Sequence, residues 1–212
     1  MGGELDAAVL AAQRGDAEAF RVLYRDLQPR LLRYLGTLVG ADAEDVASET
    51  WLQVARDFQG FTGDADGFRG WVTTIARNRA LDQLRRIRRR RPSVPVIPQR
   101  LAELGGVGLE GDVDDTAASA IEAVTTEAAL RLIATLPPDQ AEAVLLRAVV
   151  GLDAATAASV VGKRPGAVRS AAHRGLRTLA KRLTTTIPVG RVNNRDNEGV
   201  TPGLGLALKD MR

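Results

Sequence analysis

The sequence of 212 residues predicts an all-α protein made of two small helical domains that are joined by a flexible acidic linker. Apolar residues recur at helical intervals through most of the chain, and no stretch of useful length shows the apolar–polar alternation of a half-buried β-strand. Hydrophobic residues make up 45% of the chain but aromatic residues only 4%. The core is therefore expected to consist mainly of Leu, Val, Ile and Ala, which suits packed helices.

The N-terminal half is predicted to contain four amphipathic helices. Asp16 is a typical N-cap residue, and the apolar spacing that follows continues past Pro29 as a second helix and ends at Gly40. Asp42 is predicted to cap a third helix, and the glycines and aspartates of residues 59–67 predict a loop before the fourth. The apolar positions that define these helices are Phe20, Leu23, Leu27, Leu31, Leu35, Leu38, Val46, Val54, Phe58, Phe68, Trp71, Val72, Ile75, Leu84 and Ile87.

The C-terminal part has the pattern of a helix-turn-helix. Helices are expected over residues 128–136 and 138–150. They precede a short helix over 153–161, a turn that contains Gly162, and a long helix that opens at Pro165. The residues of the long helix that are expected to pack on its neighbours are Val168, Ala172, Leu176 and Leu179.

Charge follows a basic, acidic, basic order along the chain, although the net charge is only +3. Residues 77–91 contain eight arginines and one acidic residue, and residues 163–182 contain seven Lys or Arg and no acidic residue. Between them, residues 101–127 carry seven Asp or Glu and no Lys or Arg. Pro and Gly are frequent in 92–125, which predicts a linker, and the composition of 184–212 predicts a flexible tail. Such concentrated positive charge favours a polyanionic partner.

The composition excludes several classes of site. The chain has no cysteine, which excludes disulfides, Cys-ligated zinc and a thiol nucleophile. His173 is the single histidine and has no partner with which to build an ordinary zinc site. No signal peptide is recognisable, and no apolar stretch approaches the roughly 20 residues that span a bilayer. A soluble cytoplasmic protein without a metal, cofactor or small-molecule substrate is therefore expected.

The two basic helices hold the candidate nucleic-acid contacts. On the fourth helix the apolar half is expected to pack on the domain and to leave four polar residues outside, with Trp71 in the core and Asp82 in an ion pair within the helix. The outward residues are Arg77, Asn78, Arg85 and Arg86 on this helix, and Arg169, Ser170, His173, Arg174 and Arg177 on the long C-terminal helix. A solvated helix end and an αα-hairpin with a solvated basic face are the competing interpretations.

Two stretches resemble the extracytoplasmic-function (group IV) sigma factors of bacterial RNA polymerase. Residues 43–86, with the motifs EDVASETW, FRGW and IARNRALDQLRR, are similar to region 2 of that family, and residues 136–179 are similar to region 4. The resemblance covers about residues 5–183 in the family's order. It implies a region 2-like helical bundle over 5–91 and a region 4-like helix-turn-helix domain over 126–183.

The resemblance also implies roles for named residues. The expected contacts with the clamp helices of the polymerase's largest subunit are Asp45, Glu49, Thr50 and Trp51. The loop 59–67 matches the segment that receives a flipped base, and the expected contacts with the −10 element are Gln59, Phe61, Arg77, Asn78, Asp82, Arg85 and Arg86. The expected contacts with the −35 element are Lys163, Arg164, Arg169, Ser170, His173, Arg174 and Arg177.

A sigma factor of this type would bind core RNA polymerase through the clamp helices and the flap, recognise promoter DNA and start promoter melting, without enzymatic activity of its own. Many members are held inactive by an anti-sigma factor, often at the membrane. The sequence departs from the family's common pattern at Trp51, where Phe is frequent, and at Ala154 and Thr156, where Tyr and Glu are frequent.

Two other functions are compatible with parts of the sequence. The first is an autonomous helix-turn-helix regulator in which residues 1–91 form a sensor or dimerisation domain, although a sensor has no need of the basic segment 77–91. The second is a nuclease or recombinase with Mg²⁺ on Asp42, Glu44, Asp45 and Glu49, which lie on one helix and its cap without a distant partner.

Overall fold

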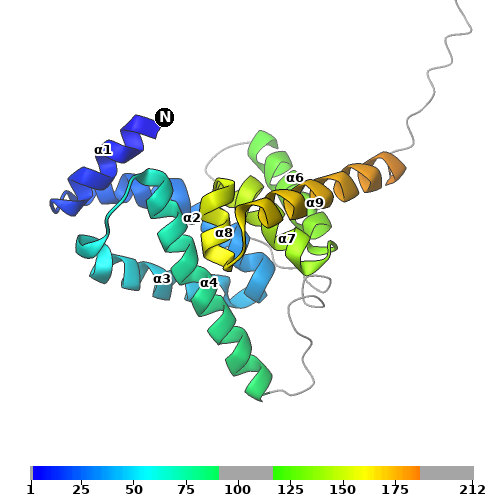
Figure 1. The fold of residues 1–212 in the computed structure, drawn as a ribbon, viewed down its shortest axis with the longest axis horizontal. Helices are drawn as coiled ribbons and strands as arrows, with labels where there is room; N and C mark the ends of the chain where they lie inside the picture. Colours follow the sequence, from blue (N-terminus) through cyan, green and yellow to red (C-terminus); the bar gives the residue numbers. More distant parts are fainter. Residues whose placement is uncertain (1, 91–116, 187–212) are drawn as a thin grey trace, which may run out of the picture.

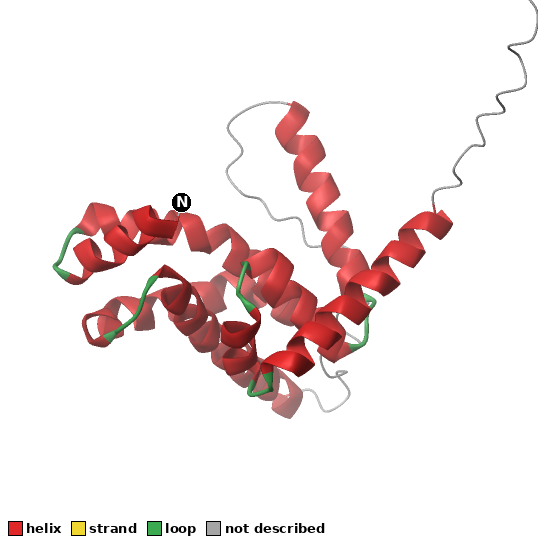
Figure 2. Cartoon of the chain, turned by 45° about the horizontal axis from the view of Figure 1, so that its top comes forward, coloured by secondary structure: helices red, strands yellow, loops and turns green. Residues whose placement is uncertain are grey.

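The computed structural model describes residues 2–90 and 117–186, and every regular element in them is a helix (Figures 1 and 2). The N-terminal part comprises α1 (Gly2–Gln13), α2 (Ala17–Val39), α3 (Ala43–Asp57) and α4 (Ala65–Arg90), with the 3₁₀ turns η1 (Gly40–Asp42) and η2 (Phe58–Gly60) on either side of α3. The C-terminal part comprises α6 (Ala117–Ala134), α7 (Pro138–Val144), the π-helical turn η3 (Leu145–Val150), α8 (Ala154–Val161) and α9 (Pro165–Thr186). The all-α fold class is confirmed.

The boundaries in the N-terminal part differ from the prediction at two points. Asp16 caps α2 as expected, because its carboxylate accepts hydrogen bonds from the backbone N–H groups of Glu18 and Ala19. The predicted break at Pro29 is wrong: α2 runs through the proline, whose ring lies on the exposed side while the leucines on either side are buried. Asp42 precedes α3 but makes no capping hydrogen bond with its side chain.

The structure contains more helix than was predicted, in α1 and at the start of α6. Helix α1 was not predicted, although its Val9 is fully buried against the bundle and its apolar residues have helical spacing. Helix α6 begins at Ala117, inside the segment 92–125 that was predicted to be a linker. The rest of that segment and the tail beyond Thr186 lie outside the described residues.

The core of the N-terminal bundle is aliphatic at one end and aromatic at the other. Leucines of α2 pack against valines of α3 and α4, as the composition predicts. The aromatic residues, though few, are concentrated in one network near η2. This network, here called the aromatic cluster, contains Phe20, Tyr24, Trp51, Phe58, Phe61, Phe68 and Trp71, which are all the aromatic residues of the chain except Tyr34.

The helix-turn-helix of the C-terminal part is formed by α8 and α9, and it packs on α7 and η3. Gly162 ends α8 with a left-handed backbone (φ +67°), which turns the chain toward α9. Val168 and Ala172 of α9 are buried as predicted, but Leu176 is 52% exposed. The neighbouring Gly175 faces α7 instead, because a Cβ there would meet Val144 Cγ2 at 2.8 Å and only a glycine permits the close crossing.

The N-cap of α8 provides a test of local stability. Asp153 Oδ1 accepts a hydrogen bond from the Thr156 N–H at 2.7 Å. We expect Asp153→Ala to lower the free energy of unfolding by about 1 kcal/mol at neutral pH. Asp153→Asn should retain most of this stability, because asparagine is an equally good N-cap residue. Urea unfolding of the three proteins measures the difference.

The pH dependence of this cap follows from the same contact. Hydrogen bonds from the side chain and backbone of Thr156 lower the pKa of the Asp153 carboxyl. The extra stability is therefore complete above the unfolded-state pKa of about 3.9 and is lost as the pH falls through the lower pKa of the folded state. The Asn variant should lack this component of the pH dependence, and equal pH curves for the two proteins would contradict the assignment.

Candidate nucleic-acid interface

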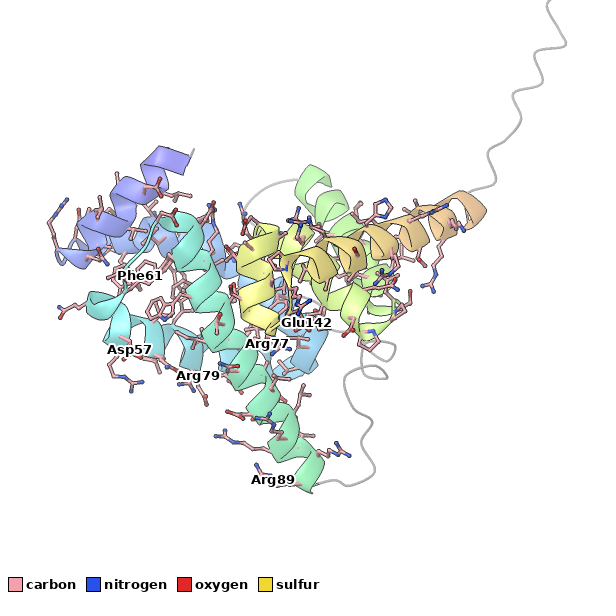
Figure 3. All side chains as sticks on the ribbon, viewed as in Figure 1. Asp57, Phe61, Arg77, Arg79, Arg89 and Glu142 are labelled. Carbon is pink, nitrogen blue, oxygen red and sulfur yellow. The ribbon has the colours of Figure 1, made fainter. Side chains whose placement is uncertain are left out.

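The loop between η2 and α4 presents a partly exposed aromatic ring. Phe61 stacks on Trp71, with ring centroids 5.1 Å apart, and its other neighbours are Phe58 and Phe68 (Figure 3). Gly63 has a positive φ of +153°, and a Cβ at this position would lie 2.9 Å from Cζ of the Phe61 ring. Gly63 therefore allows the loop to fold tightly over Phe61. The predicted contact Gln59, two residues before Phe61 in the chain, is exposed.

Helix α1 fixes the ends of this loop. Gln13 Nε2 donates a hydrogen bond to the Phe61 carbonyl oxygen at 2.5 Å, and the Ala65 N–H donates to Asp6 Oδ1 at 2.8 Å. The Asp64 carboxylate accepts from the Gly67 N–H at 2.7 Å and so caps α4. Sequence reasoning missed Asp6 and Gln13 because it did not predict α1. The helical spacing of the apolar residues in the same segment is the signal that could have found it.

The polar residues of α4 differ in exposure. Asn78, Arg85 and Arg86 are exposed, and Arg85 forms the predicted ion pair within the helix with Asp82 at 2.8 Å. Arg79 instead crosses to α3, where it contacts Glu49 Oε2 at 2.7 Å. It also donates to Gln53 Oε1. Its role in the structure is to join α3 and α4.

Arg77 lies in a different place from the one predicted. It was expected on the outer surface, but its side chain is only 21% exposed and its Nε donates to Glu142 Oε1 of α7 at 2.7 Å (Figure 3). The periodicity of α4 gave the correct face of the helix. That the C-terminal part covers this face could not be predicted, because Glu142 lies far from Arg77 in the chain.

The residues predicted to bind the polymerase also divide into two groups. Asp45 and Glu49 are exposed on α3. Thr50 is fully buried and donates to the Val46 carbonyl oxygen at 2.7 Å, and Trp51 is buried with its Nε1 donating to Gln28 Oε1 at 2.5 Å. Of these four residues, only Asp45 and Glu49 are available for direct contact with a partner. Leu52, which the sequence reasoning did not select, is 72% exposed on the same helix.

The residues predicted to contact the −35 element lie together on the exposed side of the helix-turn-helix. Arg169, His173 and Arg177 recur at one-turn intervals along α9, and all three are exposed. Lys163, in the turn before α9, pairs with Asp139 of α7 at 2.7 Å. The remaining predicted residues of this surface, Arg164, Ser170 and Arg174, are also exposed. Exposed arginines therefore follow one side of α9 over its first turns.

The described residues contain neither a candidate metal site nor a candidate membrane-spanning helix. Among residues 2–90 and 117–186, no group of three or more His, Cys, Asp and Glu side chains is arranged to hold a metal ion. Within the same residues, no helix is both long enough and apolar enough to cross a membrane. The four carboxylates considered for Mg²⁺ are thus not brought together by the fold.

Two family models match the chain in the order of the two helical parts. The model for Sigma-70 region 2 matches residues 23–91, and the model for Sigma-70, region 4 matches residues 126–179. These matched segments are called region 2 and region 4 below. The fold is shared with a solved structure of CnrH in complex with the cytosolic domain of CnrY, at a TM-score of 0.55 and 20% identity, covering 86% of this chain and 99% of that chain.

Curated relatives are similar over most of the chain. The ECF RNA polymerase sigma factor BldN of Streptomyces coelicolor is 36% identical over 174 residues, which cover 81% of this chain and 63% of BldN. The ECF RNA polymerase sigma factor SigD of Mycobacterium tuberculosis is 32% identical over 185 residues, which cover 84% of this chain and 83% of SigD. With both regions present in one chain, this protein belongs to the family of ECF RNA polymerase sigma factors.

Proposed function

We propose that this chain directs core RNA polymerase to promoters by holding two DNA elements on two separate helical surfaces, and that it starts melting at the −10 element. The proposal rests on one observation: a single chain of this family has two separate surfaces with exposed basic residues. One is the aromatic loop beside the exposed basic part of α4, and the other is the basic side of α9. Binding energy, without any bond chemistry, would be sufficient for this role.

At the −10 element the proposed contacts come from the loop and from α4. Arg85, Arg86 and Asn78 would hold the phosphate backbone, which supplies affinity without sequence information. Phe61 and Gln59 would hold an unpaired base at the loop. Removing a base from the stack costs a few kcal/mol, and stacking on an aromatic ring returns about 1–3 kcal/mol per base, so the two terms are of similar size.

At the −35 element, α9 would lie in the major groove as the second helix of a helix-turn-helix does. Residues in its first turns, such as Arg169 and Ser170, would contact base edges. Lys163 and Arg177, at the two ends of this surface, would contact phosphates. Arginine is well suited to the first role because its planar group bonds two acceptors of one guanine.

Protein partners are proposed for the surfaces that remain exposed. Asp45 and Glu49, together with the exposed Leu52 of the same helix, would contact the clamp helices of the polymerase's largest subunit, while region 4 would contact the flap. The structure of CnrH contains the cytosolic domain of CnrY, and this supports a protein regulator of comparable type, an anti-sigma factor, for this chain. We propose that the chain acts in the cytoplasm, where such a regulator could hold it at the membrane.

Run-off transcription with promoters selected from a random DNA library tests the proposed function. Specific DNA binding and initiation are expected only when core RNA polymerase is added to the chain. Tight sequence-specific binding by the chain alone, without initiation after core polymerase is added, would replace the proposal with an autonomous helix-turn-helix regulator.

A further inference from the structure

Helix α1 holds the loop that is proposed to receive an unpaired base. The helix packs on α2 and also contacts α4 (Figure 1). Val9, near its middle, is fully buried. The helix ends before residue 23, where the match to the Sigma-70 region 2 model begins. The family match therefore assigns no role to α1, and its role has to be inferred from its contacts.

Two polar side chains of α1 lie on the same face as Val9. Asp6 precedes Val9 by three residues, and Gln13 follows it by four, which is the spacing of one helix face. Asp6 and Gln13 are both half-buried. Polar groups in such positions need hydrogen-bond partners, and the loop before α4 supplies them.

Each of these side chains holds one end of the loop through a backbone group. Gln13 Nε2 donates to the Phe61 carbonyl oxygen at 2.5 Å, and Asp6 Oδ1 accepts from the Ala65 N–H at 2.8 Å. Residues 62–64 between the two anchors are exposed. Because both bonds are made to the main chain, they fix the path of the loop without occupying any of its side chains.

The two anchors leave the loop little slack. Asp6 and Gln13 are separated by roughly 10 Å along the axis of α1, at about 1.5 Å per residue. The chain from Phe61 to Ala65 can extend over at most about 14 Å. The spacing of the anchors is thus comparable with the reach of the segment that they hold, and this limits how far the loop can move.

The ring of Phe61 is fixed by the aromatic cluster. It stacks on Trp71 with an angle of 25° between the ring planes, and it is nearly parallel to Phe58, at 5° (Figure 3). The bond from Gln13 holds the backbone of the same residue. Both the main chain and the side chain of Phe61 therefore have a defined position, which suits a ring on which a base would stack.

Prior ordering of this loop matters because the energies of base capture are nearly balanced. Stacking on an aromatic ring returns about as much free energy as removal of the base from the helix costs. Fixing the backbone of one flexible residue costs about a factor of ten in an equilibrium constant. A loop that is already ordered in the free protein does not incur this cost when the base arrives.

We propose that α1 prepares the loop for base capture, with Asp6 and Gln13 as positioning residues that act through the backbone of the loop. This inference rests on the proposed function, because it concerns the loop that would hold the unpaired base. Neither residue is required to touch DNA. Loss of an anchor should therefore slow the opening of bound promoter, while the affinity for duplex promoter, which depends on the basic residues of α4 and α9, should not change.

Two substitutions of Asp6 isolate its hydrogen bond. Asp6→Ala removes the acceptor, whereas Asp6→Asn removes the same charge but keeps an oxygen that can accept from the Ala65 N–H. Fluorescence of 2-aminopurine in the −10 element of a selected promoter reports opening as the concentration of chain bound to core polymerase is varied. We expect Asp6→Ala to lower the limiting rate of opening about tenfold without changing the half-saturating concentration, and Asp6→Asn to keep nearly the parent rate.

The outcomes that would overturn the inference are specific. Equal rates in Asp6→Ala and Asp6→Asn would show that the hydrogen bond does not matter. A loss confined to the half-saturating concentration would show that Asp6 acts on DNA binding instead. Glu4→Ala is the matched control, because Glu4 is an exposed acidic residue of the same helix, and it should change neither quantity.

The other anchor gives an independent test. Gln13→Met keeps an unbranched side chain of similar length but has no donor for the Phe61 carbonyl oxygen. The limiting rate of opening should again fall about tenfold at an unchanged half-saturating concentration. A parent-like rate in Gln13→Met would contradict the role of this anchor.

Hydrogen exchange tests the anchoring in the free chain. The Ala65 amide should exchange about tenfold faster in Asp6→Ala than in the parent chain or in Asp6→Asn. The Val72 amide, within α4, should exchange at the parent rate in all three if the bundle remains folded. Unchanged exchange at Ala65 in Asp6→Ala would overturn the inference. Failure of the proposed function would appear differently, as a parent chain that opens no promoter with core polymerase whatever the exchange shows.

Discussion

Arg169→Ala is expected to lower initiation from a selected promoter by about tenfold to a hundredfold. Arg169 lies near the start of α9 and is exposed on the side that is proposed to enter the major groove. A bidentate contact between arginine and guanine contributes about 1–3 kcal/mol of discrimination, and each 1.4 kcal/mol corresponds to roughly a factor of ten. Run-off transcription at fixed salt measures the loss, and repeating the promoter selection with the variant shows where specificity has relaxed.

Arg131→Ala is the matched control for this experiment. Arg131 is an exposed arginine of α6 in the same C-terminal part, and it pairs weakly with Glu127 at 3.7 Å. The substitution removes the same charge at a distance from the proposed DNA surface, so initiation should be nearly unchanged. Equal losses in both variants would mean that general positive charge, and not a base contact by Arg169, determines promoter binding.

Phe68→Ala is expected to lower the free energy of unfolding by about 3–5 kcal/mol. Phe68 is 2% exposed at the start of α4, and its ring packs edge-to-face on Phe58 and Phe61 at centroid distances of 5.5 and 5.9 Å. A small domain has only about 5–15 kcal/mol of total stability, so this variant should lose much of it. Urea unfolding followed by far-UV circular dichroism gives the change.

Leu10→Ala separates loss of the aromatic cluster from loss of apolar surface in general. Leu10 is a large apolar residue of α1, but it is 55% exposed, and its truncation should change stability by less than about 0.5 kcal/mol. A Phe68→Ala variant that unfolds at the same urea concentration as Leu10→Ala would show that the cluster does not support the bundle.

Several parts of the fold could be predicted because they depend on local chemistry. Asp16 caps α2 as predicted, because its short side chain accepts from nearby backbone N–H groups. Gly162 ends α8 because it adopts positive φ without cost. Helix α1 was missed although its apolar residues have helical spacing. The break at Pro29 was predicted wrongly because leucines buried against other helices hold α2 on both sides of the proline. Burial by a distant element leaves only a weak trace in the sequence of the segment itself.

The candidate DNA surfaces were predictable to different degrees. The basic side of α9 follows from helical spacing alone, and the structure exposes all of its predicted residues. The four residues predicted to contact polymerase share one helix but not one environment, since Thr50 and Trp51 are buried. The concentration of nearly all aromatic residues around Phe61 could not be deduced, because these residues come from α2, α3, η2 and α4.

The sequence by itself determined the all-α class and the helix-turn-helix with its basic face. It also determined the resemblance to ECF sigma factors, which the family matches confirm. These properties depend on spacing, on capping residues and on motifs within single segments. Only the tertiary structure decided that Arg77 pairs with Glu142 and that Gly70 of α4 lies against the Thr156 side chain of α8. The same holds for the hydrogen bond by which α1 fixes the loop at Phe61. Such pairings join residues far apart in the chain, and their free energy depends on a particular packing of helices that no local pattern encodes.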